Sequence, residues 1–316
     1  MRIFADYPSG SSPVFDPAAA RERIRVNLAG VRAIVAIASA KGGAGKSAIA
    51  VNLAAALALK GRKIALLDAD LNAPSVPAML GMKVRRRLLP EEIIEPAAGP
   101  FGLRVAWSGM VPGGEPAPIS FVEENGAAPP PRPAAMPCHA GALADLLSRI
   151  AFGPLDAIVA DLAPGIGRLR EIAALVALDA VILVSRPSGL AANAAREAIE
   201  AAAAAGAPVA GIVENLAGFN CDGCRTVRPL WPEGNLPGVA HAAGVPILAR
   251  LPFDSRLAES SDRGTLFVKE WADTPTAREL ENLANRIDAI LQANAHPAAV
   301  PAQCADRTFS TSEAAK

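Results

Sequence analysis

The stretch Ser39-Ala-Lys-Gly-Gly-Ala-Gly-Lys-Ser47 decides the fold of this chain. It ends an apolar run, Ile34–Ser39, and opens a helical pattern over Ser47–Lys60. A strand that leads into a glycine-rich turn and then a helix directs backbone N–H groups and the positive end of the helix dipole at one point. The stretch therefore predicts a phosphate-binding loop, with a glycine-rich turn that arose by chance as the alternative.

Each residue type in the loop has a physical role in holding a nucleotide. We expect the backbone to surround the phosphates, Lys46 to reach the β- and γ-phosphates, and the Ser47 hydroxyl to bind Mg²⁺. The predicted nucleotide-binding residues of the loop are Gly42, Gly43, Ala44, Gly45, Lys46, Ser47 and Ala48.

Short apolar runs alternate with helical patterns along the rest of the chain, which predicts an α/β fold with a doubly wound, mainly parallel sheet flanked by helices. The predicted strands are Ile34–Ser39, Lys63–Asp68, Leu103–Trp107, Ala157–Asp161, Ala180–Ser185, Pro208–Asn215 and Pro246–Leu251. The predicted helices are Ser47–Lys60, Gly141–Ile150, Leu190–Ala204 and Thr276–Gln292.

The composition of the segments predicts one domain. We expect residues 1–30 to form a flexible N-terminal segment and residues 31–294 to form a P-loop ATPase domain. Within that domain, residues 111–138 are rich in Pro and Gly and predict a surface excursion. Residues 295–316 are rich in Ala, Ser and Thr and predict a disordered tail.

The overall composition narrows the class of protein. The 316 residues carry 31 basic and 31 acidic side chains, and this balance argues against a nucleic-acid partner, which would favour a basic excess. No uninterrupted apolar run has transmembrane length, and the N-terminus lacks a signal-peptide pattern. Only 4 cysteines are present, too few for a disulfide framework. We expect a cytoplasmic protein with no membrane partner.

Three aspartates lie at the carboxyl ends of predicted strands, where open α/β sheets bind their ligands. Asp68 and Asp70 flank Ala69, so they share one side of an extended chain. We assign Asp68 to the water shell of Mg²⁺, Asp70 to orienting the attacking water, and Asp161 to holding the metal through water. The alternative for each is an ordinary strand-end cap.

The stretch Glu214-Asn215-Leu-Ala-Gly-Phe-Asn-Cys221-Asp-Gly-Cys224 carries the next signal. An amide at Asn215 can pair with the edge of adenine, or it can simply cap the strand. Cys221 and Cys224 offer two thiolates where a cluster needs four ligands, and an isologous dimer would supply the other two. A structural zinc site and a redox dithiol are the alternatives.

The order of these motifs resembles the Mrp/ApbC family of iron–sulfur carriers, which are deviant-Walker P-loop ATPases. The resemblance rests on the loop with its early Lys41, on Asp68 to Gly81, on Asp161 to Gly167, on Val213 to Cys224, and on Leu251 to Gly264. It implies an ATP-binding homodimer in which Lys41 reaches the partner's nucleotide. It also implies a bridging four-iron, four-sulfur cluster on Cys221 and Cys224 of both subunits, delivered to apo iron–sulfur proteins.

Several positions depart from the pattern of that family. Ala48 replaces a Thr of the phosphate loop, and Ala163, Ile166 and Arg168 replace a Pro, a Thr and an Asp of the loop after Asp161. These changes fall on loops that sense the nucleotide, so we expect slow ATP hydrolysis. The alternative functions are a positioning or partitioning ATPase of the same class, and a weakly hydrolysing regulatory homologue with a structural zinc at the C-x-x-C.

Overall fold

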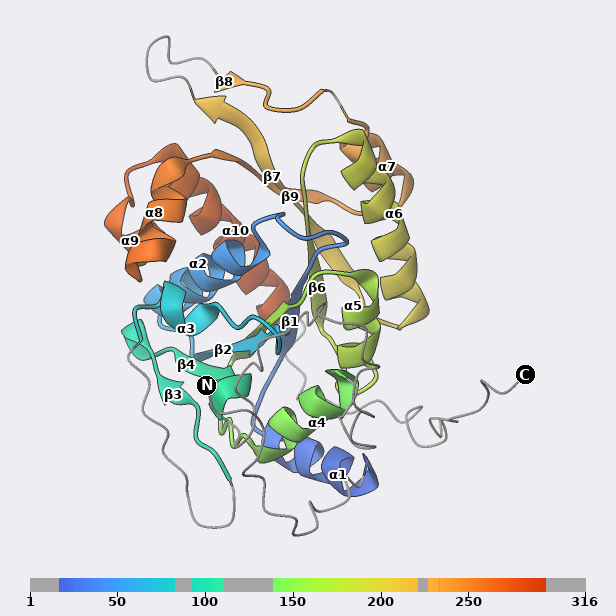
Figure 1. Ribbon diagram of the computed structural model, residues 1–316, viewed down its shortest axis with the longest axis vertical. Helices are drawn as coiled ribbons and strands as arrows, with labels where there is room; N and C mark the ends of the chain where they lie inside the picture. The colour runs from blue at the N-terminus through green and yellow to red at the C-terminus, as the bar shows by residue number, and fades with distance from the viewer. Residues whose placement is uncertain (1–16, 83–92, 111–138, 221–226, 233, 294–316) are drawn as a thin grey trace, which may run out of the picture.

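The computed structural model describes residues 17–82, 93–110, 139–220, 227–232 and 234–293, and Figure 1 labels their helices and strands. The predicted excursion at residues 111–138, the cysteine pair and the predicted tail at residues 295–316 lie outside this part of the chain.

A sheet of nine strands forms the centre of the described chain. Its order is β3-β4-β2-β5-β1-β6-β7-β8, and β9 pairs with β7. All pairs are parallel except β3 with β4 and β7 with β8. The strands are β1 Ile34–Ala38, β2 Ile64–Ala69, β3 Ala97–Ala98, β4 Arg104–Trp107, β5 Ala157–Leu162, β6 Ala180–Ser185, β7 Val209–Asn220, β8 Val227–Arg228 and β9 Ile247–Phe253.

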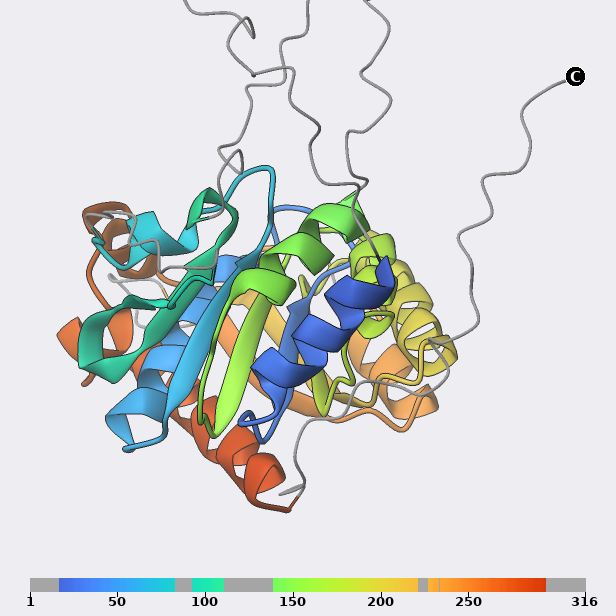
Figure 2. The same ribbon diagram turned by 90° about the horizontal axis from the view of Figure 1, so that it is seen from below.

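Helices cover both faces of the sheet. The helices α2, α3, α8, α9 and α10 contact one another on one face, and α1, α4, α5, α6 and α7 form the second layer. Figure 1 shows α2 beside α10, and Figure 2 shows α1 beside α4. The bounds are α1 Pro17–Leu28, α2 Lys46–Leu59, α3 Val76–Met79, α4 His139–Arg149, α5 Ile166–Ala173, α6 Gly189–Ala204, α7 Leu236–Ala242, α8 Ser255–Arg263, α9 Phe267–Glu270 and α10 Pro275–Ala293.

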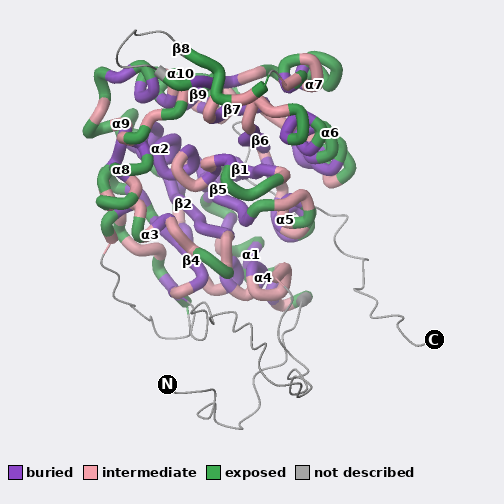
Figure 3. The backbone as a smooth tube through the Cα atoms, turned by 45° about the horizontal axis from the view of Figure 1, so that its top comes forward, coloured by how far each residue is buried: buried purple, intermediate pink, exposed green. Residues whose placement is uncertain are grey.

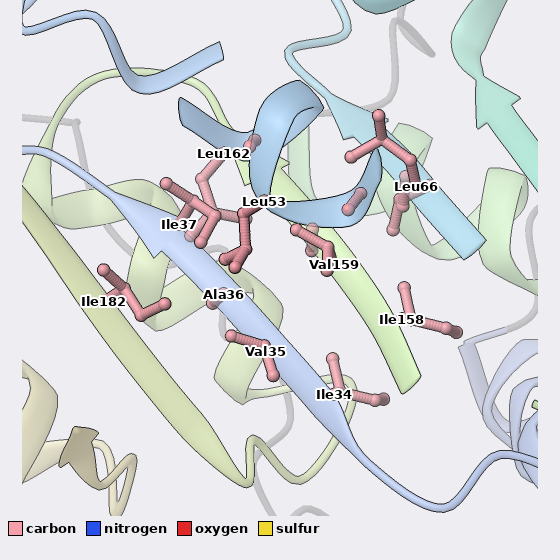
Figure 4. Packing of buried hydrophobic residues seen from close by; sticks show 14 of the residues in the cluster. Ile34, Val35, Ala36, Ile37, Leu53, Leu66, Ile158, Val159, Leu162 and Ile182 are labelled. Atoms are coloured by element: carbon pink, nitrogen blue, oxygen red, sulfur yellow. The ribbon is translucent and has the colours of Figure 1, made fainter. Parts of the chain in front are cut away.

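The core lies along the central strands, which are buried on both faces. Every residue of β1, β2, β5 and β6 is buried, as Figure 3 shows by colour. Leu53 of α2 points toward the sheet, close to Ile37 of β1 and Val159 of β5 (Figure 4). Burial on both faces explains why these strands are continuous apolar runs instead of alternating patterns.

The predicted doubly wound fold is confirmed. The four predicted helices correspond to α2, α4, α6 and α10, and each predicted strand has a counterpart in the sheet. The prediction ended the strand of Asn215 too early, because β7 continues to Asn220. Leu216 has a positive φ of 57°, and the pairing of β7 with β9 shifts register between Asn215 and Phe219. The strand therefore bends at Leu216 and resumes beyond it.

The N-terminal segment needs a correction, because residues 17–28 of the expected flexible region form the helix α1. Ala20, Ile24 and Leu28 recur every four residues and are buried, and α1 packs against α4. The apolar stripe therefore holds this part of the segment on the domain. Within the described residues, no helix combines the length and apolar character that crossing a membrane requires.

Candidate nucleotide site and the cysteine segment

The phosphate loop follows β1, at the point where the sheet reverses its winding order. β1 lies between β5 and β6, so the loop opens at the crevice where doubly wound folds bind ligands. Gly43 and Gly45 have positive φ values of 72° and 83°, a conformation that glycine adopts without strain. A Cβ at Gly45 would also collide with the side-chain amide of Asn215. Only glycine fits that position.

The helix after the loop begins with free backbone donors. α2 starts at Lys46 after Gly45, and its first intrahelical bond runs from Ile49 N–H to Gly45 O (3.1 Å). The N–H groups of Lys46, Ser47 and Ala48 thus have no acceptor within the helix. Together with the helix dipole, they form an anion-binding helix terminus of the kind that holds phosphate.

Lys46 and Asp161 form a buried ion pair beside these donors. Lys46 Nζ lies 3.4 Å from Asp161 Oδ1, and the two side chains are 8% and 0% exposed. Burial raises the pKa of Asp161, and this rise is opposed by the charge of Lys46 and by a hydrogen bond from the Ser47 hydroxyl. The Asp161 Oδ2 atom is buried without a hydrogen-bond partner.

This arrangement fits a magnesium ion. Carboxylate and hydroxyl oxygens are the protein ligands that Mg²⁺ accepts, directly or through water. Asp161 offers an unpartnered buried oxygen, and the Ser47 hydroxyl lies beside the same carboxylate. A buried polar atom without a partner normally requires an ion, a water or a ligand. The chemistry of Ser47 and Asp161 therefore suits the metal of a nucleotide complex.

Asp68 is the direct sheet neighbour of Asp161, but its carboxylate is already engaged. The two residues pair in register between β2 and β5. Asp68 Oδ2 accepts hydrogen bonds from the N–H groups of Ser75 (2.8 Å) and Val76 (2.9 Å), and Oδ1 accepts one from Asp70 N–H (3.1 Å). Burial raises the pKa of Asp68 to about 7, with a further rise from Asp161 and a reduction from the Val76 hydrogen bond.

Asp70 lies beyond the end of β2, so it does not continue the extended chain that the sequence predicted. It is half-buried, and its Oδ1 atom accepts a hydrogen bond from Ala73 N–H (3.3 Å). The strand ends at Ala69, and the Asp68 carboxylate accepts hydrogen bonds from the loop that carries Asp70. Asp70 is thus held on a turn at the carboxyl end of the sheet, and its expected role toward water stays a prediction.

Asn215 contacts the phosphate loop directly. Its side-chain amide is buried and donates to Ala44 O (2.8 Å). The sequence predicted a role in holding the nucleotide but not this contact with the loop. Recognition of adenine by Asn215 stays a prediction, as does the role of Lys41, which is exposed.

The cysteine pair falls between two described strands. β7 ends at Asn220, one residue before Cys221, and β8 begins at Val227. The Phe219 ring lies 6.3 Å from the Phe253 ring, between centroids, and both side chains are exposed. Within the described residues, no group of three or more His, Cys, Asp or Glu side chains is arranged to hold a metal ion.

Three further contacts have no recognisable signal in the sequence. Ser108 Oγ donates to Leu71 O (3.3 Å), which ties the loop after β2 to the end of β4. Trp231 donates from Nε1 to Leu216 O (3.1 Å) at the bend of β7, and the guanidinium of Arg186 lies over its ring at 5.0 Å. Such contacts depend on tertiary placement, which spacing along the chain does not encode.

A family model and curated relatives match most of this chain. Residues 30–288 match the model of the ParA group described as NUBPL iron-transfer P-loop NTPase. An iron–sulfur cluster carrier protein of Saccharolobus solfataricus is 30% identical over 274 residues, 86% of this chain and 88% of the relative. The human cytosolic Fe-S cluster assembly factor NUBP2 is 31% identical over 283 residues, 87% of this chain and 97% of the relative.

Solved structures agree on the architecture. A nucleotide-binding protein of Archaeoglobus fulgidus in complex with ADP superposes with a TM-score of 0.64 and 28% identity, over 82% of this chain and 96% of that one. The cell division ATPase MinD of Pyrococcus furiosus gives a TM-score of 0.58 at 19% identity, over 82% of this chain and 99% of that one. At that identity, the likeness to MinD extends to the fold alone.

Proposed function

The chain belongs to the family of NUBPL iron-transfer P-loop NTPases, and from this premise we propose that it is an ATP-binding and ATP-hydrolysing carrier that transfers iron–sulfur clusters to apoproteins. The relatives named as cluster carriers and as an assembly factor, matched over most of both chains, support this proposal.

One observation carries the proposal: a single strand, β7, connects the phosphate loop to the cysteine pair. Asn215 of β7 bonds to the phosphate loop at Ala44 O, and the same strand ends one residue before Cys221. A change in the loop on nucleotide binding or loss would therefore act on the strand that leads to the cysteines. Coupling between the nucleotide and the cysteines requires that the strand has two states and that these states differ in their affinity for the nucleotide.

On the nucleotide side, we infer that the backbone of Gly42–Ser47 surrounds the phosphates of ATP and that Lys46 neutralises their charge. Mg²⁺, held by the Ser47 hydroxyl and through water by Asp161, would supply further charge neutralisation at the transferring phosphoryl group. Asp70 would orient the attacking water, and Lys41 would reach the nucleotide of a second subunit.

On the cluster side, Cys221 and Cys224 supply two thiolates per chain, and a four-iron, four-sulfur cluster takes four. A homodimer that brings two such pairs together would complete the set, and the cluster is then its cargo. Transfer requires thiolates of an apo iron–sulfur protein to replace those of the carrier. No nucleic-acid or membrane partner is part of this proposal, and the cytoplasm is its proposed location, as in the name of the human relative.

Slow hydrolysis is part of the proposal. The guanidinium of Arg168, in the first turn of α5, donates to both oxygens of Glu171 (2.7 and 2.8 Å), so this side chain is committed to its own helix. Ala48 lacks a hydroxyl that could meet a phosphate, and a lost neutral hydrogen bond costs on the order of 1 kcal/mol. We therefore expect the chain to bind nucleotide more weakly than a relative with that hydroxyl, but still to bind it.

Anaerobic reconstitution and transfer test the function. The chain is reconstituted with iron and sulfide, and an apo-ferredoxin is then added with ATP, with ADP or without nucleotide. We expect the brown chromophore to form, to move to the acceptor, and to move at a rate that depends on the nucleotide. Cys221→Ala and Cys224→Ala should not load, while the control Cys304→Ala should load normally.

Other outcomes would reject the proposal in distinguishable ways. If the chromophore forms equally in Cys221→Ala and in the unaltered chain, Cys221 is not a ligand of the cluster and the proposed cluster site is wrong. If the loaded protein transfers its cluster at the same rate with ATP, with ADP and without nucleotide, the nucleotide does not control the transfer. A protein that stays colourless and retains zinc supports the structural zinc site instead.

A further inference from the structure

The loop between β2 and α3 is fixed by one buried side chain. Asp68 is fully buried, and its carboxylate accepts hydrogen bonds from the N–H groups of Asp70, Ser75 and Val76 at 3.1, 2.8 and 2.9 Å. These donors lie at the two ends of the loop, so one carboxylate holds its start and its finish together. Hydrogen bonds from N–H groups to an ionised acceptor are among the stronger ones in proteins.

The loop is also held from its other side. Ser108 Oγ, at the end of β4, donates to Leu71 O (3.3 Å), and Asp70 Oδ1 accepts from Ala73 N–H (3.3 Å). Beyond α3, Gly81 and Gly264 pack backbone to backbone, so that a Cβ at Gly81 would lie 2.6 Å from Gly264 O. The segment that carries Asp70 is therefore fixed at its start, its middle and its far end.

Asp68 and Asp161 differ in what their oxygens can still bind. A carboxylate offers about four lone-pair sites, and Asp68 uses three of them on backbone N–H groups. Asp161 keeps a buried oxygen with no partner and lies beside Lys46 (3.4 Å). Of these two neighbouring carboxylates, only Asp161 has an oxygen that accepts no hydrogen bond, whereas both oxygens of Asp68 are bonded to the loop.

We propose that Asp68 is a positioning residue: it fixes the loop from Asp70 to Ser75, and so the Asp70 carboxylate, and it takes no part in the water shell of the metal. This inference rests on the proposed ATP hydrolysis and reassigns one residue within it. Asp68 then contributes to turnover only through Asp70. A misplacement of a catalytic group by about 1 Å can lower turnover by on the order of 100-fold.

Steady-state hydrolysis by the full chain tests the assignment. The variants are Asp68→Asn, Asp70→Ala, the combination of both, and Ser108→Ala, which loosens the same loop from the other side. Ser148→Ala is the matched control, because Ser148 and Ser108 are equally buried at 7% exposure and Ser148 Oγ also donates to a backbone carbonyl, Asp145 O.

The expected result is specific to positioning. Asp68→Asn should lower kcat by about 10- to 100-fold, while the KM for MgATP and the Mg²⁺ concentration for half-maximal rate stay within about twofold. Because the two residues act as a unit, adding Asp68→Asn to Asp70→Ala should change kcat by less than about twofold. Ser108→Ala should lower kcat by several-fold, and Ser148→Ala should leave it unchanged.

Two results would overturn the assignment. One is a rise of about tenfold or more in the Mg²⁺ requirement of Asp68→Asn, which places Asp68 in the metal's water shell. The other is a loss in the combined variant that multiplies the two single losses. If Asp68→Asn does not fold, Ser108→Ala against Ser148→Ala decides alone: equal kcat values for the two variants reject the proposal.

A second measurement does not need turnover. Amide hydrogen exchange at one or more of Asp70, Ser75 and Val76 should be at least about tenfold faster in Asp68→Asn than in the unaltered chain, since asparagine has one acceptor oxygen where the carboxylate has two. Unchanged exchange at these amides rejects the proposal. If the unaltered chain shows no hydrolysis, the proposed ATPase activity fails, and the exchange measurement still decides whether Asp68 holds the loop.

Discussion

Replacing Gly264 with alanine should destabilise the protein by about 2–5 kcal/mol. Gly264 caps α8 with a φ of 69°, which costs a residue with a Cβ about 1–2 kcal/mol. The new Cβ would also overlap the Cα of Gly81, and the neighbouring atom is backbone, which cannot turn aside. Forcing an extra carbon into such a contact costs about 1–3 kcal/mol.

Gly244→Ala is the matched control for this prediction. Gly244 follows α7 with a φ of 66°, and a Cβ there would meet nothing within 4 Å. The control therefore carries the backbone strain of about 1–2 kcal/mol without the collision. The difference between the two variants isolates the contact between α3 and α8.

Urea unfolding followed by circular dichroism measures both variants, with the unfolding slope m as the check for two-state behaviour. We expect Gly264→Ala to lose about 1–3 kcal/mol more than Gly244→Ala. We also expect it to lower ATP turnover more, because α3 must shift to make room. Equal losses of unfolding free energy in the two variants would refute the close packing of Gly81 on Gly264.

Three further predictions concern the buried polar groups. As the pH rises from about 4 to about 7, unfolded Asp68 ionises before the folded group does, because its pKa is 3.8 unfolded and about 7 folded. The unfolding free energy of the unaltered chain should therefore fall by up to roughly 4 kcal/mol relative to that of Asp68→Asn. Thermal unfolding of both proteins without nucleotide, over this pH range, measures the difference, and parallel pH curves would contradict the prediction. Lys46→Ala leaves the Asp161 carboxylate buried without a counter-charge and should cost about 3–5 kcal/mol, and adding Asp161→Asn should recover part of that loss; no recovery would argue against the pair. Asn215→Ala removes the donor to Ala44 O and should cost about 1–3 kcal/mol and weaken ADP binding in calorimetry, whereas unchanged affinity would separate Asn215 from the loop.

Much of the fold followed from local patterns that the structure confirms. The glycine-rich loop between Ile34–Ser39 and Ser47–Lys60, and the continuous apolar runs, were sufficient to predict a parallel sheet wrapped by helices. These signals are local, because strand burial and helix periodicity are expressed in neighbouring residues. The helix α1 was also encoded locally, in the spacing of Ala20, Ile24 and Leu28, but the Pro- and Ser-rich stretch before it obscured that pattern.

The site was harder to predict where a side chain bonds to a distant part of the chain. The sequence around Asp68 and Asp70 does not show whether the chain continues as a strand or turns. Only the fold reveals that the Asp68 carboxylate accepts hydrogen bonds from Ser75 and Val76. Asn215 was predicted from its place after an apolar run, but its bond to Ala44 joins residues 171 positions apart. The bend at Leu216, with a φ of 57°, has no signature in the residue type.

Native mass spectrometry of the anaerobically reconstituted chain can decide whether two copies share one cluster, because it reports the number of subunits and the bound iron and sulfide together. We expect particles of two chains that carry about four iron and four sulfide, and we expect neither Cys221→Ala nor Cys224→Ala to carry them. Single chains that hold zinc, or paired chains that carry no iron and sulfide, would contradict the claim that two copies share one cluster.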